Sequence, residues 1–128
     1  MTGLRSNDLV AFIPTTNPKR ARAFFEKTLG LEFVSDDGFA LVFEAHGTPI
    51  RVVNVASVPS YVPAQFTILG WQVRDIRTTV RDLVNRGLAF ERYEGMDQDD
   101  DQIWTAPGGA RIAWFKDSDG NILSLSEH

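Results

Sequence analysis

Side chains that could bind a metal ion or act as nucleophiles are few in this sequence. The 128 residues include two histidines, His46 and His128, and no cysteine, which excludes disulfides, thiolate metal sites and a cysteine nucleophile. Glu44 and His46 are spaced to lie on one strand face and could together bind a metal ion. Because His46 stands in a Gly-Pro loop, we interpret it instead as a solvent-exposed histidine. No serine has the sequence setting of a nucleophile elbow, so no nucleophilic triad is predicted.

The acidic clusters do not match a calcium loop. Such a loop needs alternating oxygen ligands, a central glycine and a closing glutamate. Neither Asp97-Gln98-Asp99-Asp100-Asp101 nor Asp117-Ser118-Asp119-Gly120 has that spacing. We interpret the first as a solvated loop and the second as a hairpin turn. Gly108-Gly109 is not followed by a helix or a P-loop lysine, so it predicts a turn and not a phosphate site.

The first half of the chain predicts a strand, a helix and three further strands. Thr16-Asn17-Pro18 supplies a capping residue followed by the proline favoured in a first helical turn. Apolar residues at helical spacing continue to Leu29, and Gly30 fits a C-terminal stop. The predicted elements are a strand over 9–14, a helix over 18–29, and strands over 31–35, 39–44 and 50–55.

The same order begins again after a linker that contains Pro59 and Pro63. A strand over 66–73 precedes Asp75, which we expect to cap a helix that ends at Arg86-Gly87. The apolar stripe of this helix consists of Ile76, Val80, Leu83 and Val84. Strands are predicted over 88–93, 103–105, 111–115 and 122–125.

This repetition is the strongest indication of the fold. Leu29-Gly30-Leu31-Glu32-Phe33 matches Arg86-Gly87-Leu88-Ala89-Phe90, each ending a helix and entering a strand. We predict an α+β fold of two βαβββ modules whose paired, curved mixed sheets carry outer helices and enclose a central cleft. The expected single domain covers 1–128, with modules over about 8–57 and 65–126 and a linker over about 58–64.

Three stretches resemble a known superfamily. Ala23-Phe24-Phe25-Glu26-Lys27-Thr28-Leu29-Gly30-Leu31 is similar to its helix exit, and Gly70-Trp71-Gln72-Val73-Arg74-Asp75-Ile76 to the entry of its second module. Phe115-Lys116-Asp117-Ser118-Asp119-Gly120-Asn121 is similar to its Asp-Pro-Asp-Gly-Asn hairpin, with Ser118 in place of proline. The chain thus resembles the vicinal oxygen chelate, or glyoxalase/bleomycin-resistance/dioxygenase, superfamily from Asp8 to Ser126.

This resemblance implies positions for metal ligands, and the residues there are unsuitable. Members of the superfamily place His, Glu or Gln on the first and last strands of each module. Here those positions fall on Val10, Ile68, Ser124 and either Val53 or Asn54. Aliphatic side chains cannot coordinate an ion, and Ser and Asn are weak neutral ligands. We therefore expect no metal and no cofactor.

Without the metal, the resemblance implies a cleft that binds a ligand. We predict a metal-independent small-molecule binding protein of the bleomycin-resistance type, which holds a planar or apolar organic ligand. The alternative is a metal-dependent lyase or dioxygenase acting on an oxygen-bearing metabolite. Whether any reaction is catalysed stays open at this point, as does a metal-free enzyme that uses Glu or Asp as a base.

Strand alternation, read with the family's cleft-facing positions, gives a candidate site. Phe12 falls on the side of Val10, and Gly70 and Gln72 fall on the side of Ile68. An apolar floor with a few polar groups suits stacking plus one or two hydrogen bonds. The predicted ligand-binding residues are Phe12, Asn54, Gln72, Trp104 and Ser124. The competing interpretation is that these residues only fill the cleft.

Composition limits the partners. Lys and Arg total 13 and Asp and Glu total 17, for a net charge of −4 without a basic stripe. We therefore expect neither nucleic acid nor a membrane as a partner. No apolar run approaches the roughly 20 residues that cross a bilayer, and the stretch from Met1 to Arg5 lacks a signal-peptide core. We expect a cytoplasmic protein, and the resemblance together with the exposed sheet edges implies a homodimer.

Overall fold

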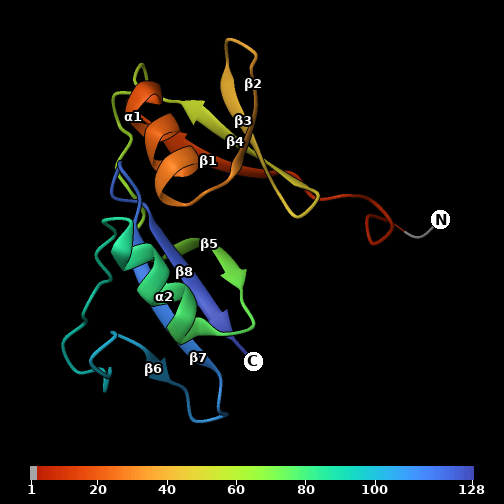
Figure 1. Cartoon of the computed structure of the whole chain (residues 1–128). Helices are drawn as coiled ribbons and strands as arrows, with labels where there is room; N and C mark the ends of the chain where they lie inside the picture. Colours follow the sequence, from red (N-terminus) through yellow and green to blue (C-terminus); the bar gives the residue numbers. More distant parts are fainter. Residues whose placement is uncertain (1–2) are drawn as a thin grey trace. The chain divides into compact units, whose positions relative to one another are not determined.

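The chain divides into two compact units, each with its own sheet and helical segment. The computed structural model describes residues 3–128, and the units are Met1–Tyr61 and Val62–His128. Figure 1 shows a four-stranded sheet in each unit. Among the described residues no helix is long and apolar enough to cross a membrane. The single domain over 1–128 and the module and linker limits given above stay predictions.

The first sheet has the strand order β1-β4-β3-β2. β1 pairs with β4 in parallel, and the other two pairs are antiparallel. Its elements are β1 (Ala11–Thr15), α1 (Pro18–Ala23), the π-helical turn η1 (Phe24–Thr28), β2 (Glu32–Asp36), β3 (Ala40–Ala45) and β4 (Thr48–Asn54).

The second sheet repeats this arrangement with the order β5-β8-β7-β6. β5 and β8 are parallel, and the other pairs are antiparallel. Its elements are β5 (Thr67–Gln72), α2 (Ile76–Asn85), β6 (Trp104–Thr105), β7 (Arg111–Lys116) and β8 (Ile122–Glu127). The α+β class and the doubled order of strand, helix and three strands are therefore confirmed.

Local sequence explains where both helical segments begin and end. The Asn17 side chain accepts a hydrogen bond from the Arg20 backbone N–H at 3.1 Å, and Asp75 accepts one from that of Thr78 at 3.1 Å. These bonds satisfy N–H groups that a first helical turn leaves without partners. At the other end, Gly30 and Gly87 adopt φ of 74° and 99°, the left-handed conformation that ends a helix.

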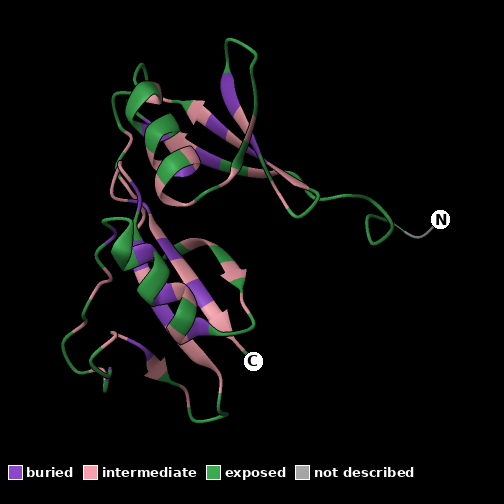
Figure 2. Ribbon diagram, in the orientation of Figure 1, coloured by how far each residue is buried: buried purple, intermediate pink, exposed green. Residues whose placement is uncertain are grey.

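Each unit buries apolar side chains where its helical segment packs on its sheet. Figure 2 shows buried residues, in purple, alternating with more exposed ones along the strands. Three of the four residues predicted for the apolar stripe of α2 are buried, namely Ile76, Val80 and Leu83, whereas Val84 is half exposed. The buried residues of the first unit include Ile13, Ala21, Phe25, Phe43, Ile50 and Val52, and those of the second include Leu88, Ile103, Ala113, Phe115, Leu123 and Leu125.

The strand predicted over 88–93 is wrong. In place of a strand, this stretch forms an isolated β-bridge between Phe90 and Phe115. The physical reason lies in the side chain of Gln98. Its amide oxygen accepts from the Tyr93 N–H at 2.7 Å, and its Nε2 donates to the Glu91 carbonyl at 2.9 Å. A side chain thus satisfies backbone groups that a neighbouring strand would otherwise have paired.

Candidate ligand-binding face

The second sheet has one face turned away from its core. Leu123, Leu125, Ala113 and Phe115 are buried and alternate with less buried residues along β7 and β8. Because strand side chains alternate, the opposite face carries the residues between them. We call it the open face of the second sheet, defined by Gly70, Gln72, Trp104, Trp114 and Ser124.

The strand register places three of the predicted site residues on this open face. Gly70, Ser124 and Trp114 form one row of partners across β5, β8 and β7. Gln72, Ser126, Ile112 and Trp104 form the adjacent row. Gln72, Trp104 and Ser124 therefore share one surface, with Trp104 at the β6 end and Gln72 at the β5 end.

An aromatic cluster occupies the β6–β7 side of this face. The rings of Trp104 and Trp114 have centroids 6.1 Å apart, and Tyr93 meets Trp114 edge-on at 5.6 Å. Both separations lie in the range of favourable aromatic contacts. Trp71 belongs to the other face, where it stacks on Phe115 at 6.4 Å. Of these three aromatic residues, only Trp104 was predicted from the sequence as a site residue; Tyr93 was predicted to lie in a strand over 88–93.

Polar groups lie beside the aromatic cluster on the β5–β8 side. Ser124 is partly buried, whereas Gln72 is exposed. A Cβ atom at Gly70 would lie 2.6 Å from the Ser124 Oγ, so the absence of a side chain at Gly70 leaves space for this hydroxyl. The face therefore combines ring surfaces with an amide and a hydroxyl, which can orient a planar molecule.

Phe12 and Asn54 belong to the first unit and lie on opposite faces of its sheet. Phe12 pairs with Arg51, and Thr15 pairs with Asn54, so the positions on β4 are three residues apart. Alternation then places Phe12 on the exposed face and Asn54 on the face of buried Val52. Val53, and not Asn54, shares the face of Phe12. By strand alternation the two residues therefore lie on opposite faces of the first sheet. That each of the five residues contacts a ligand stays a prediction.

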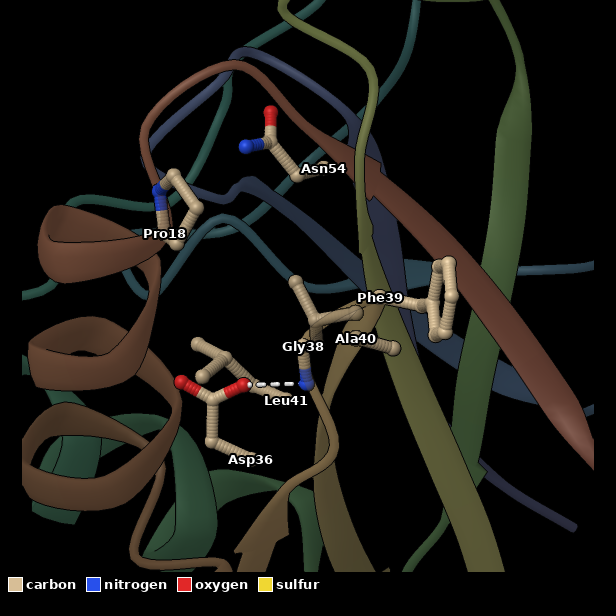
Figure 3. A pocket seen from close by; sticks show the side chains of 8 residues that line it. Pro18, Asp36, Gly38, Phe39, Ala40, Leu41 and Asn54 are labelled. Atoms are coloured by element: carbon tan, nitrogen blue, oxygen red, sulfur yellow. Dashed lines mark hydrogen bonds between the residues drawn. The ribbon is translucent and has the colours of Figure 1, made fainter.

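A small cavity lies beside Asn54 in the first unit (Figure 3). It has a volume of about 210 Å³, and Asn54 is the one predicted site residue on its wall. The Asp36 carboxylate accepts from the Gly38 N–H at 3.0 Å, and Asn54 accepts from the Ala56 N–H at 2.9 Å. These bonds shape local turns. The lining residues are Pro18, Asp36, Gly38, Phe39, Ala40, Leu41, Val52 and Asn54.

The donor chemistry does not fit the metal that the fold family implies. The four positions carry Val10, Ile68, Ser124 and Val53 or Asn54, which offer at most a neutral hydroxyl and an amide. No group of three or more His, Asp or Glu side chains is arranged to hold an ion among residues 3–128. Glu44, near the end of β3, and His46, which has φ of 50° in the turn between β3 and β4, are both exposed.

Electrostatics keep the tyrosine of the aromatic cluster neutral. Burial raises the pKa of the Tyr93 hydroxyl above its ordinary value, and the nearby Glu91 carboxylate raises it further. The hydroxyl is thus protonated at neutral pH and can donate a hydrogen bond. Lys116 forms an ion pair with Glu91 at 3.6 Å at the edge of this region.

Comparison with known proteins agrees with this architecture. The family model described as Glyoxalase/Bleomycin resistance protein/Dioxygenase superfamily matches residues 8–125. No curated protein matches the chain in sequence. A superfamily member from Sphaerobacter thermophilus is similar in structure, with a TM-score of 0.75 at 22% identity over 95% of this chain and 97% of that one.

Two further solved structures share the fold at low identity. TnmS3, an antibiotic binding protein from Streptomyces sp. CB03234, gives a TM-score of 0.69 at 20% identity, with 94% of each chain covered. Lactoylglutathione lyase from Agrobacterium tumefaciens gives a TM-score of 0.68 at 17% identity, over 95% of this chain and 93% of that one. Identities this low establish the fold but not the activity. Since the family model spans nearly the whole chain, the protein belongs to the glyoxalase/bleomycin resistance protein/dioxygenase superfamily.

Proposed function

We propose that the protein is a metal-independent small-molecule binding protein that holds a planar organic ligand against the open face of the second sheet. The observation that carries this proposal is the juxtaposition of Trp104 and Trp114, whose ring centroids are 6.1 Å apart, with Ser124 as the register partner of Trp114. Ring faces supply apolar stacking area, and the hydroxyl and the Gln72 amide supply direction.

Stacking on Trp104 and Trp114 favours a flat ligand. An aromatic contact contributes about 0.5–1.5 kcal/mol beyond the area that it buries. Burying apolar surface adds about 25 cal/mol per Å². A flat ligand of two or three rings therefore gains more from this surface than a non-planar ligand of the same size, which cannot stack on both indole rings. The antibiotic binding protein of the same fold is a precedent for ligand binding on this architecture.

Metal independence rests on the side chains at the family's ligand positions. Val10 and Ile68 have no donor atom, and Ser124 lies opposite Gly70 and not opposite a carboxylate or an imidazole. A divalent ion needs several charged or imidazole ligands. A lyase or dioxygenase that polarises its substrate through such an ion is therefore the less supported alternative.

Calorimetric titration tests the proposed face. Chelator-treated protein would be titrated with naphthalene and quinoline, two flat probes of the same shape. Trp104→Leu should weaken both probes at least about fivefold, the loss of roughly 1 kcal/mol of stacking. Phe66→Leu is the matched control, because Phe66 is also an exposed aromatic residue of the second unit but lies outside β5. Equal affinity of wild type and Trp104→Leu would refute the location.

The same proposal includes a homodimer. Phe12 is 63% exposed on β1, an outer strand of the first sheet, and Leu9 just before it is 77% exposed. A second copy could cover this apolar strand region. Sedimentation equilibrium should give a dimer at micromolar concentration. Phe12→Asp should shift it toward monomer, while Phe39→Asp, at an even more exposed phenylalanine beside a turn, should not. A monomeric wild type would contradict this part of the proposal.

A cytoplasmic location is also proposed, on composition alone. Fractionation of the native host's cells should recover the chain with cytoplasmic enzymes. Recovery from the exported fraction would overturn this assignment.

A further inference from the structure

The segment between α2 and β6 is held in place by the side chain of Gln98. This residue is 7% exposed, although its segment contains no helix or strand. Its amide oxygen accepts from the Tyr93 N–H at 2.7 Å, and its Nε2 donates to the carbonyls of Glu91 and Gln102, each at 2.9 Å. An amide is the side-chain group that offers one acceptor and two donors in this arrangement.

Both ends of the segment are also attached to regular structure. The Glu91 N–H donates to the Trp114 carbonyl of β7 at 2.8 Å. Arg77 of α2 pairs with Asp99 at 2.7 Å and also with Asp101. Gln98 itself forms a bridge with Trp104. The segment is therefore fixed beside the edge of the second sheet formed by β6 and β7, and from there the Tyr93 ring reaches Trp114 of the open face.

This anchoring places the side chain of Tyr93 beside Trp114. Its ring meets Trp114 edge-on at 5.6 Å, and the residue is partly buried. Within residues 3–128 no protein group forms a hydrogen bond with its hydroxyl. A partly buried tyrosine hydroxyl normally finds a partner, so this one is a donor still available to a ligand.

We propose that Tyr93 contacts the bound ligand by donating a hydrogen bond to an acceptor atom at the ligand's rim, and that Gln98 is the positioning residue that holds Tyr93 there. This rests on the proposed function and narrows its ligand class to planar aromatic molecules with a rim nitrogen or oxygen acceptor. Trp104 and Trp114 supply the stacking surface, and Tyr93 selects for the acceptor.

Quinoline and naphthalene distinguish this role from simple packing, because they share a shape and only quinoline has an acceptor nitrogen. The measured quantity is the ratio of their affinities for the chelator-treated full-length protein. Wild type should prefer quinoline by about threefold to tenfold, the effect of one neutral hydrogen bond. Tyr93→Phe keeps the ring and should abolish the preference while leaving naphthalene affinity unchanged.

The role of Gln98 is tested by a double-variant cycle. Gln98→Met should lower the quinoline preference toward that of Tyr93→Phe, and should have no further effect on it in the Tyr93→Phe background. If Gln98→Met does not fold, Gln98→Glu, which keeps the acceptor for the Tyr93 N–H but loses both donors, serves in its place. A purely structural Gln98 would lower the melting temperature and weaken both probes equally, which would overturn the positioning role.

The two proposals fail in different ways. If both probes bind wild type equally and Tyr93→Phe changes neither affinity, the inference about Tyr93 is wrong and the binding face stands. If neither probe binds wild type, the proposed function at this face is wrong together with the inference.

Discussion

Gly70 of β5 and Ser124 of β8 are register partners, and a Cβ atom at Gly70 would lie 2.6 Å from the Ser124 Oγ. A real Cβ atom does not approach another heavy atom this closely, so the serine hydroxyl occupies space that any other residue at position 70 would need. The hydroxyl's position on the open face thus depends on the glycine beside it.

Gly70→Ala should therefore destabilise the protein by about 1 kcal/mol, because overpacking outweighs the entropic gain of replacing glycine. Chemical denaturation would measure this. Adding Ser124→Ala removes the Oγ and should restore most of the loss, since the next atom, the Ser124 carbonyl oxygen, lies at 3.4 Å. Additive effects of the two substitutions would show that the contact is not the cause.

Gln72→Leu should separate binding from stability. Gln72 is exposed, and no group in the described part of the chain forms a hydrogen bond with its amide. The free energy of unfolding should change by no more than about 0.5 kcal/mol, as for an ordinary surface substitution, while the affinity for quinoline falls. Gln65→Leu, another exposed glutamine of this unit, is the control. A loss of 1 kcal/mol or more without ligand would assign Gln72 a structural role.

Ser118→Pro should stabilise the turn between β7 and β8. The Ser118 hydroxyl is buried without a hydrogen-bond partner, and no described carbonyl accepts from its N–H. The Gly120 N–H donates to the Asp117 carbonyl at 3.1 Å, so position 118 is the first central residue of a turn, where proline is favoured.

The expected gain for Ser118→Pro is about 0.5–1 kcal/mol, seen as a higher melting temperature. Ser118→Ala should raise the melting temperature less, since it removes the unpaired hydroxyl but does not restrict the unfolded chain as proline does. A melting temperature below that of wild type would mean that the turn geometry excludes proline.

Asp37 should make stability depend on pH in the acid range. Its carboxylate accepts from the N–H groups of Ala40 and Phe39 and pairs with Arg51 at 2.7 Å, which lowers its pKa from 3.8 to about 2. A lowered pKa in the folded state means that the stabilisation is present above pH 3.8 and is lost as the pH falls toward about 2.

Urea denaturation between pH 5 and pH 2 would follow this effect of Asp37. The stability difference between wild type and Asp37→Asn should shrink progressively as the pH falls through this window. A difference that stays constant across the window would show that the ionised carboxylate contributes nothing to stability.

The sequence predicted those features that depend on local chemistry. Asn17 and Asp75 cap helices because their side chains reach an N–H three residues ahead, and this spacing is visible in the sequence. The sequence did not reveal the Gln98 side chain as the partner of Tyr93, since that contact requires a specific loop conformation. The strand predicted over 88–93 is wrong for this reason, and the role proposed for Tyr93 could not be predicted from the sequence.

The face of Asn54 could not be predicted either, because a one-residue change in register moves every side chain of a strand to the other side. The register, in which Phe12 pairs with Arg51 and Pro14 with Val53, places Val53 on the same face as Phe12. In the second unit strand alternation predicts that Gln72 and Ser124 share one face, and the register agrees, since Gly70 pairs with Ser124 and Gln72 with Ser126.

The most direct test of metal-independent binding is a calorimetric quinoline titration of protein purified without a metal-affinity step. One half of the sample is treated with chelator, and the metal content of both halves is measured. We predict no stoichiometric metal and equal quinoline affinity, within about twofold, before and after chelation and after addition of Fe²⁺, Mn²⁺, Ni²⁺ or Zn²⁺. Stoichiometric metal whose removal abolishes quinoline binding would contradict the account.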